Sequence, residues 1–150
     1  MDVDTPVDRI MSRRLVTVEL DDSLEVIRDI LDATRFHHVL AVEDGRLYGV
    51  VSDRDLLRAL SPYIGSTVET PRDVATLNKR VHQIMTRKPI TLREGDSIAS
   101  AARHMLDARI SCLPVVDADM KPVGIVTWRD VLRFVVSEDG GPPRAADSAR

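Results

Sequence analysis

The stretch Val7–Ser23, VDRIMSRRLVTVELDDS, returns 74 residues later as Val81–Ser97, VHQIMTRKPITLREGDS. A second stretch, GVVSDRDLLR at Gly49–Arg58, returns as GIVTWRDVLR at Gly124–Arg133, 75 residues later because one residue has been inserted. Solenoid proteins use several units of ~20–50 residues, so two copies at this longer spacing predict a pair of small folding units. We expect these units to pack face to face about a pseudo-twofold axis, with the functional site in the cleft on that axis.

Composition narrows the class of protein. The chain has 150 residues, which suits one compact domain or two fused half-domains. Its net charge of −3 disfavours nucleic acid as a partner, because nucleic-acid-binding proteins usually carry a basic face. No apolar run approaches the ~18 residues of a membrane-spanning helix, and the acidic N-terminus does not resemble a signal peptide. The single cysteine, Cys112, excludes a disulfide within the chain and is expected to be a small buried residue in a reducing cytoplasm.

Each copy is predicted to fold in the order β-α-β-β-α. A short strand, at 15–18 or 89–92, precedes a helix that begins at an Asp-Ser pair, whose side-chain oxygens can cap the first N–H groups. Two strand-like runs follow, and Asp44-Gly45 is a strong turn signal between the first pair. A second helix begins at Ser52 or Thr127. One helix crossing between strands indicates a partly parallel sheet with helices on one face, so the fold class is α/β, two β-α-β-β-α repeats about a pseudo-twofold axis.

The helical spacing of apolar residues predicts which faces turn toward the core. These residues are Leu24, Ile27, Ile30, Leu31, Ile98, Ala101, Met105 and Leu106 in the first helices, and Leu56, Leu57, Leu60, Val131, Leu132 and Val135 in the second.

The domain boundaries follow from the repeats. They are 7–60 for the first repeat, 61–80 for a linker, 81–136 for the second repeat and 137–150 for a flexible tail. In the linker, Pro62, Gly65 and Pro71 are expected to interrupt regular structure, and Asp73–Lys79 is predicted to form about two helical turns. The tail is rich in Gly and Pro and is expected to fray.

In both copies, a strand glycine is followed by two apolar residues, a hydroxyl, a variable position, an arginine and an aspartate. One interpretation is structural: Ser52 and Thr127 are helix N-caps, and Asp55 and Asp130 complete capping boxes. The other is functional, because an arginine in the first helical turn opposes the helix dipole and both copies keep it. A carboxylate there can accept hydrogen bonds from a cis-diol, while the arginine and free N–H groups bind a phosphate. The glycine leaves room for a flat ring to approach the strand.

The order IM(S/T), strand Thr, Asp-Ser, LPVVD and G-h-h-(S/T)-x-R-D, given twice, resembles a tandem pair of CBS domains, the regulatory module of cystathionine β-synthase. The resemblance covers most of the chain, and the whole chain is similar to stand-alone bacterial CBS-pair proteins, including those described as acetoin-utilisation proteins. The family implies a disc-like pair that binds adenosine nucleotides between the repeats. It places the final Asp of each motif on the ribose hydroxyls, the strand Thr and nearby apolar backbone on the base, and basic residues on the phosphate.

Carried over by position, the resemblance implies two binding sites, each made from both repeats. The first combines Thr17, Phe36 and His37 with Thr127, Arg129 and Asp130, and the second combines Thr91, Ile110 and Ser111 with Ser52, Arg54 and Asp55. Both copies keep the hydroxyl and the aspartate, so neither site can be dismissed. Trp128 stands where the first repeat has Asp53, and it is either a stacking surface for a base or partner, or a plain exposed residue.

Two adjacent histidines, His37 and His38, would point to opposite faces of a strand, so they are not expected to bind one metal together. The other two histidines supply no metal-binding spacing, and no metal site is predicted. One of the pair is expected either to face the cleft, where it can meet a phosphate, or to be a satisfied edge residue. Its equivalents, Ser111 and Cys112, are uncharged, so the two sites would differ in charge.

The sequence carries no nucleophile–base pair, phosphate-binding loop or dinucleotide motif, so no catalytic residue and no required cofactor are predicted. It predicts a regulatory module, not an enzyme, that senses AMP, ADP or ATP. The alternatives are a ligand-free homodimerising scaffold and a module for another adenosyl ligand, such as S-adenosylmethionine or NAD. Expected partners are the nucleotide, a second copy of the chain and an unidentified effector protein, but neither nucleic acid nor membrane; the expected location is the cytoplasm.

Overall fold

The computed structural model describes residues 2–137, which fall into two compact units. Unit 1 comprises the chain up to Leu15 and from Ile90 onward, and unit 2 comprises Val16–Pro89. Each unit therefore contains residues from both sequence repeats. Among the described residues, no helix is both long enough and apolar enough to cross a membrane. The predicted flexible tail lies, from residue 138 onward, outside the described residues.

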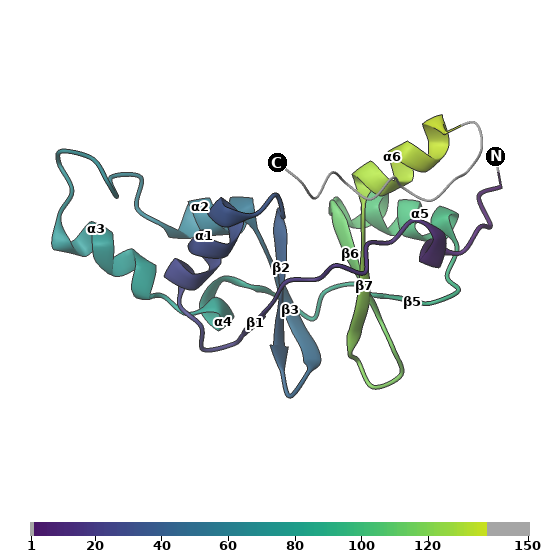
Figure 1. Cartoon of the computed structure of the whole chain (residues 1–150), viewed down its shortest axis with the longest axis horizontal. Coiled ribbons are helices and arrows are strands. Elements are labelled where there is room, and N and C mark those ends of the chain that lie inside the picture. Colours follow the sequence, from purple (N-terminus) through teal and green to yellow (C-terminus); the bar gives the residue numbers. More distant parts are fainter. Residues whose placement is uncertain (1, 138–150) are drawn as a thin grey trace. The chain divides into compact units, whose positions relative to one another are not determined.

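Unit 2 contains a four-stranded sheet in the order β1-β2-β3-β4. Its elements are β1 (Thr17–Glu19), α1 (Leu24–Ala33), β2 (His38–Glu43), β3 (Arg46–Ser52), α2 (Asp53–Ala59), α3 (Pro71–Ala75), the 3₁₀ turn η2 (Thr76–Asn78), α4 (Val81–Ile84) and β4 (Thr86–Arg87). Because α1 crosses between them, β1 and β2 are parallel, whereas β2 and β3 form an antiparallel hairpin. Figure 1 shows α2 at the end of this hairpin that lies opposite its turn.

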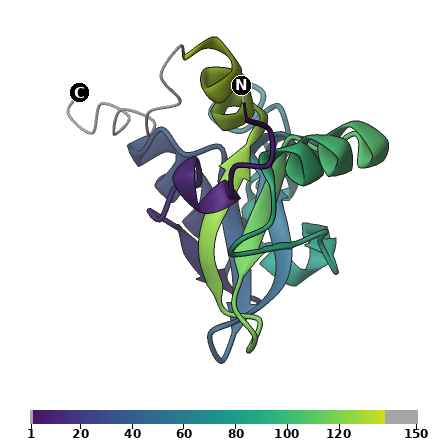
Figure 2. The same ribbon diagram turned by 90° about the vertical axis from the view of Figure 1, so that its right-hand side faces the viewer.

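Unit 1 repeats this plan with a three-stranded sheet in the order β5-β6-β7. Its elements are the 3₁₀ turn η1 (Val7–Arg9), β5 (Leu92–Arg93), α5 (Ile98–Ala108), β6 (Cys112–Val116), β7 (Pro122–Thr127) and α6 (Trp128–Val136). In Figure 2, α6 continues from the end of β7 that lies opposite the hairpin turn. The predicted order β-α-β-β-α is confirmed in both repeats. The predicted strand at 89–92 is wrong in detail, because β5 begins only at Leu92 and Thr91 precedes it.

The turn between β2 and β3 is the one that its sequence predicts. Asp44 and Gly45 have φ values of 51° and 75°, the left-handed conformations that a two-residue hairpin turn matching the strand twist requires. In unit 1 the longer turn is held by Asp117, whose carboxylate accepts hydrogen bonds from the N–H groups of Asp119 (2.8 Å) and Lys121 (2.9 Å). In each unit, the hairpin that precedes the second helix therefore has a well-defined turn at the end opposite that helix.

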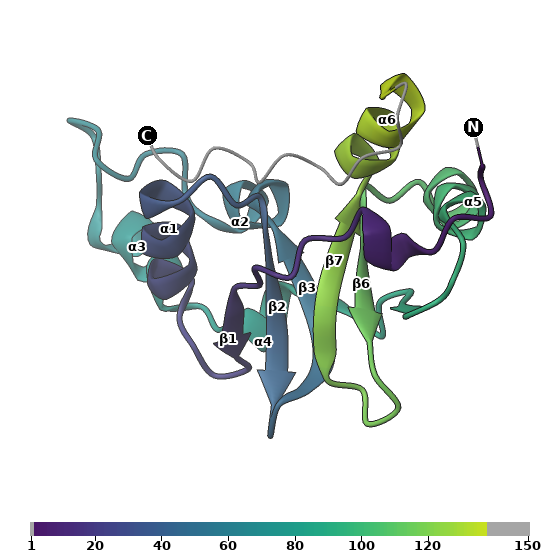
Figure 3. The same cartoon turned by 45° about the vertical axis from the view of Figure 1, so that its right-hand side comes forward.

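The opening segment of each repeat, at residues 7–12 and 81–86, pairs with the other half of the chain; we call these the lead segments. The N–H of Val7 donates to the carbonyl of Asp96 (2.7 Å), and the N–H of the equivalent Val81 donates to that of Asp22 (2.9 Å). The first lead segment then pairs with β7, and the second pairs with β3 through β4. Figure 3 shows the first lead segment beside β7. Each lead segment therefore pairs with the other sequence repeat, and the two segments make equivalent backbone hydrogen bonds.

A methionine in each lead segment fills the space beside a strand glycine. A Cβ built on Gly124 in β7 would overlap the sulfur of Met11, and a Cβ built on Gly49 in β3 would overlap that of Met85. The sequence interpretation that these glycines leave room for a ligand ring is therefore wrong, because methionine occupies the space where a side chain would project. The glycines serve the packing of the lead segments.

Each unit has its own aliphatic core. The fully buried members include Val7, Leu92, Leu113, Val115 and Val126 in unit 1, and Leu24, Ile27, Val39, Val51 and Val81 in unit 2. Four residues predicted to face the core are instead exposed: Leu57 (74%), Leu106 (78%), Leu132 (49%) and Val135 (49%). A short helix buries one stripe against its sheet, and in α6 the buried position is taken by Phe134. The apolar residues of these helices therefore exceed what one stripe can bury.

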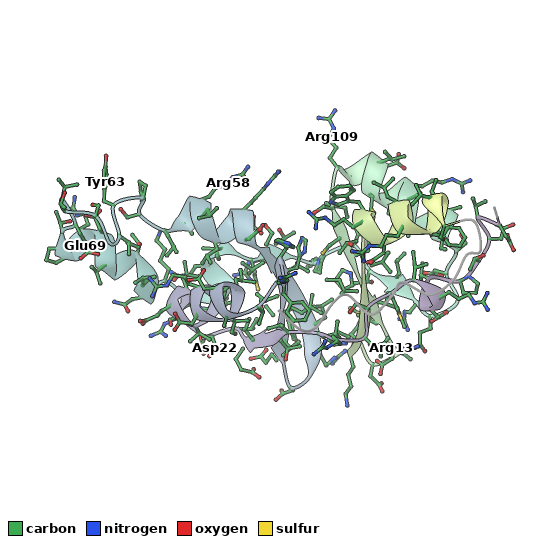
Figure 4. All side chains as sticks on the ribbon, turned by 45° about the horizontal axis from the view of Figure 1, so that its top comes forward. Arg13, Asp22, Arg58, Tyr63, Glu69 and Arg109 are labelled. Carbon is green, nitrogen blue, oxygen red and sulfur yellow. The ribbon has the colours of Figure 1, made fainter. Side chains whose placement is uncertain are left out.

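The linker is folded against unit 2. Its helix begins earlier than predicted, because Pro71 occupies the first helical position, where its missing N–H costs nothing, and does not interrupt the helix. Asp73 accepts a 2.7 Å hydrogen bond from the hydroxyl of Ser61, and this bond, with those from the helix N-cap, lowers the pKa of Asp73. The side chain of Tyr63 extends outward from the loop that precedes α3 (Figure 4), whereas Oε1 of Glu69 accepts a 2.9 Å hydrogen bond from the N–H of Gly65 in the same loop.

Substituting Gly49→Ala is expected to destabilise the protein by ~1–3 kcal/mol, the usual cost of overpacking a core, because the new methyl group meets Met85. The free energy of unfolding from urea denaturation measures this cost. In a Met85→Ala background, which has its own cavity cost of ~2–5 kcal/mol, the alanine at position 49 should cost little. An equal cost in both backgrounds would show that the methionine is not the obstacle.

Candidate functional site

The second helix of each repeat begins with a complete capping box. Ser52 Oγ accepts from the N–H of Asp55 (3.1 Å), and Asp55 Oδ2 accepts from the N–H of Ser52 (2.9 Å). Thr127 Oγ1 accepts from the N–H of Asp130 (3.4 Å), and Asp130 Oδ2 accepts from the N–H of Thr127 (2.8 Å). The structural interpretation of the motif is therefore confirmed in both copies. It leaves the functional interpretation open, because a cap uses only part of each side chain.

The capping aspartates keep a second carboxylate oxygen outside the capping bonds. In Asp130, which is buried, Oδ1 lies 3.8 Å from Nη1 of Arg133. Oδ2 also accepts a 3.0 Å hydrogen bond from the hydroxyl of Thr127. Asp55 is half-buried, and its Oδ2 accepts the capping hydrogen bond from the backbone N–H of Ser52. Both carboxylates are thus oriented by the backbone before any ligand arrives, which suits an acceptor of hydrogen bonds.

Beside the first capping box lies a histidine–aspartate pair. Nδ1 of His37 is 3.0 Å from Oδ2 of Asp53, and both side chains are about half exposed. Burial acts to raise the pKa of Asp53, but the hydrogen bonds from His37 and from the N–H of Arg54 outweigh it and hold that pKa below its usual value. The neighbouring His38 is more enclosed, and burial lowers its pKa. Among residues 2–137, no group of three or more His, Cys, Asp or Glu residues is placed to hold a metal ion.

The equivalent position in the second repeat has different chemistry. Trp128 occupies the place of Asp53, and this residue is 47% exposed. The guanidinium carbon of Arg129 lies 5.7 Å from the centre of a Trp128 ring, within the range of a cation–π contact. The second repeat thus presents an aromatic ring and a cation where the first presents a carboxylate and an imidazole.

The structure places the predicted site residues in both units. Unit 2 holds Thr17, Phe36, His37, Ser52, Arg54 and Asp55, whereas unit 1 holds Thr91, Ile110, Ser111, Thr127, Arg129 and Asp130. Within each unit, the backbone ladder brings the segment before the middle strand to the start of the second helix: the N–H of Asp53 donates to the carbonyl of His37 (2.9 Å), and that of Trp128 to Ser111 (3.0 Å). The predicted sites combine residues of different units, so these combinations stay predictions.

Asp53 adjoins the predicted site residues, and the sequence interpretation missed it because it treated this position as variable. Its partner could not be predicted from the turn alone, because a regular hairpin closed by Asp44-Gly45 would place His37 opposite Ser52. The register shifts by one residue at an irregularity between Ala41 and Val42, so that His38 lies opposite Ser52 and His37 lies beside Asp53.

Comparison with known proteins identifies the relatives of this chain. The family model of the CBS domain matches residues 7–62 and 81–137. A CBS domain-containing protein of Dictyostelium discoideum is 33% identical over 132 residues, which are 87% of this chain and 90% of that protein. Other relatives are longer: the chain spans 48% and 43% of two proteins of Methanocaldococcus jannaschii.

Two solved structures are similar over nearly their whole length. CBSX2, a CBS domain-containing protein of Arabidopsis thaliana, was solved in complex with AMP; it is 31% identical, with a TM-score of 0.71 over 87% of this chain and 95% of that one. The CBS domain pair of protein MJ0100, solved with 5′-methylthioadenosine and S-adenosyl-L-methionine, is 30% identical, with a TM-score of 0.72 over 87% and 95%. These similarities confirm the α/β fold that was predicted for the repeats.

Removing the cap hydroxyl by Thr127→Ala is expected to lower the free energy of unfolding by ~0.5–2 kcal/mol without any ligand, because one N–H at the start of α6 loses its acceptor. Ser23→Ala is the matched control, since Ser23 is the N-cap of α1 but makes no side-chain capping bond. Chemical denaturation of both variants tests the difference. Equal losses would contradict the capping role of Thr127.

The lowered pKa of Asp53 predicts a pH dependence. A carboxylate whose folded pKa lies below its ordinary value of 3.8 stabilises the fold above that pH, and the contribution is lost as the pH falls through the folded pKa. Asp53→Asn should therefore cost up to ~1 kcal/mol at pH 7, a surface-pair value, and less at each step below pH 3.8. Urea denaturation along this pH series, with Asp44→Asn as the control, measures it. A cost that does not change with pH would contradict the assignment.

Proposed function

The chain belongs to the CBS domain family, and on this premise we propose that it is a regulatory module that binds adenosine nucleotides, AMP, ADP or ATP. The observation that carries the proposal is the AMP complex of CBSX2, a protein of the same fold with which the chain aligns almost end to end. The chain keeps the hydroxyl, arginine and aspartate of the motif in both repeats. Its two capping boxes hold the aspartates in place.

In this proposal, the ribose is recognised by the capping aspartates. Oδ1 of Asp55 or Asp130, the oxygen outside the cap, accepts hydrogen bonds from the two ribose hydroxyls. Arg54 or Arg129, at the second helical position, binds phosphate together with free N–H groups of the helix start.

The remaining contacts of each site come from the other repeat, as the resemblance implies. The base lies against the strand threonine and the backbone that precedes the middle strand. The proposed sites are therefore Thr17, Phe36, His37, Thr127, Arg129 and Asp130 for one nucleotide, and Thr91, Ile110, Ser111, Ser52, Arg54 and Asp55 for the other.

The regulatory step is a shift between two states of the module. A ligand changes their populations only through its different affinity for them, and a nucleotide bound by both repeats favours the state in which these residues converge. We propose that the protein acts in the cytoplasm, carries out no chemistry and signals to an effector protein. Exposed apolar residues on the helices, including Leu57 and Leu132, support pairing with a second copy of the chain.

A second candidate is a different adenosyl ligand, favoured by the MJ0100 complex with 5′-methylthioadenosine and S-adenosyl-L-methionine. A cationic sulfonium needs no phosphate-binding arginine. Binding of S-adenosylmethionine would therefore tolerate Arg54→Ala and Arg129→Ala, whereas binding of AMP would not.

Thermal unfolding with AMP, ATP, S-adenosylmethionine and NAD tests these proposals. A ligand at 100 times its dissociation constant adds ~2.7 kcal/mol, which raises the midpoint by several degrees for a chain of this size. Asp55→Ala and Asp130→Ala should each reduce the ligand-induced rise, measured against the same variant without ligand. Asp107→Ala, an exposed residue on α5, is the control. If nucleotide-free protein responds to none of the four ligands, the scaffold alternative replaces the sensor.

A further inference from the structure

We infer that one face of α6 is a docking surface for a helix of another protein, one that carries apolar residues beside carboxylates. Exposed apolar side chains run along this face, which we call the α6 ridge: Trp128, Leu132, Val135 and Val136. The inference deepens the proposed function, because it names the surface that the effector protein contacts and the chemistry that the effector presents there. It takes from the proposed function only the existence of an effector.

The α6 ridge lies outside the face by which α6 packs on its own unit. Phe134 is buried in the unit 1 core and Val131 packs against that core, so these two positions mark the inward side of the helix. Three ridge residues recur at four-residue intervals, which places them along another side of the helix: Trp128, Leu132 and Val136. A surface helix usually turns polar residues to the solvent. A second apolar stripe bordered by polar residues therefore indicates a surface that another molecule covers.

The helix α2 shows that the fold itself does not require the α6 ridge. Both helices follow the same strand and begin with the same capping box. The three ridge positions correspond to the following residues of the first repeat: Asp53 for Trp128, Leu57 for Leu132, and Ser61 for Val136. One apolar residue in three remains there, and unit 2 still forms its core. The complete stripe is therefore a property of the second repeat, and binding is a better explanation for it than folding.

Two guanidinium groups line one flank of the α6 ridge. Arg129 and Arg133 each follow a ridge residue directly and are four residues apart, so they lie on the same side of the helix. The guanidinium carbon of Arg129 is 5.7 Å from the centre of a Trp128 ring, and the side chain of Arg133 is 53% exposed. Within α6, these two cations are accompanied by one carboxylate, that of the buried Asp130. The flank thus has an excess of positive charge, which favours carboxylates on the partner.

The form of the α6 ridge selects a helix as the partner. Apolar anchors spaced by about one helical turn fit the side chains of a second helix, and Trp and Arg are the residue types that most often dominate the binding energy of an interface. A second copy of the chain would bring the same two arginines to this contact, whereas an acidic helix pairs with them. The charge of the flank therefore assigns α6 to the effector, and the exposed Leu57 of α2 and Leu106 of α5 remain to support pairing with a second copy.

The protein contains its own reporter for this surface, because Trp128 is its single tryptophan. The probe is a synthetic peptide without tryptophan, about 20 residues long so that it forms a helix by itself, with leucines along one side and glutamates beside them. In the control peptide, lysines replace the glutamates. We expect the glutamate peptide to shift Trp128 emission to shorter wavelength as the ring leaves water. It should bind about tenfold more tightly than the lysine peptide at low salt, and raising the salt should reduce this preference.

Substitutions on the ridge and its flank separate apolar contact from charge. Leu132→Ser and Val136→Ser should each weaken binding of the glutamate peptide about tenfold, because each removes apolar surface from the contact. Arg133→Gln should reduce the preference for glutamate over lysine. Leu57→Ser is the matched control, since it makes the same change at the equivalent position of α2, and it should leave the affinity unchanged. Urea denaturation of each variant checks that the fold is intact.

The remaining outcomes overturn the inference. Equal affinity for the two peptides, or no binding of either, would show that the α6 ridge does not select an acidic helix. If Trp128 emission of the protein alone moves to shorter wavelength as its concentration rises, and Leu132→Ser abolishes this change, the ridge is covered by a second copy instead. The thermal shifts described above test nucleotide binding separately. A protein that binds the glutamate peptide but none of the four adenosyl ligands would refute the proposed function and leave this surface in place.

Discussion

The contact between a methionine and a strand glycine is the constraint on which the rest of the structure depends. Met11 packs against Gly124 and Met85 against Gly49, so each lead segment is fixed to the strand that leads into a capping box. Each contact lies three residues before the N-cap hydroxyl of Thr127 or Ser52. The close approach leaves no room for a Cβ, which explains why both copies have glycine at this place without any reference to a ligand.

The capping aspartates combine two demands. Their Oδ2 atoms hold the start of a helix, and in the proposed function their Oδ1 atoms hold a ribose. The cap orients the carboxylate in advance, so a ligand does not have to immobilise it. Around this shared feature the repeats have diverged: the pair His37–Asp53 and the pair Trp128–Arg129 surround the same backbone arrangement with different charge. The repeat thus preserves geometry while its variable position sets the electrostatics.

Much of the fold was predictable because local signals agreed with it. Asp44-Gly45 fixed a hairpin turn, and Ser52 and Thr127 fixed two helix starts, each through a bond to a near neighbour in the sequence. The predictions that failed concern contacts between residues far apart in the sequence. Leu57, for example, was predicted to face the core but is exposed, because one short helix buries only one stripe of apolar residues against its sheet.

The exchange of the lead segments is the other part that local patterns did not reveal. Nothing near Met11 in the sequence points to Gly124. The predicted site shows the same difference. The helix caps could be predicted from neighbouring residues in the sequence, whereas the combination of residues from two units remains a prediction. The pairing of Asp53 with His37 belongs with the part that was not predicted, because it depends on a shift in the hairpin register that the turn residues do not reveal.

The exchange of the lead segments also gives the chain an order of assembly. Unit 2 is one continuous stretch, Val16–Pro89, and it separates the two parts of unit 1 along the chain. During synthesis the first lead segment is therefore made before unit 2, whereas β7, with which it pairs, is made after unit 2. Until the second part of unit 1 exists, Val7, Ile10 and Met11 lack core partners such as Leu113 and Val126. The apolar side chains of this lead segment therefore stay exposed while the whole of unit 2 is synthesised.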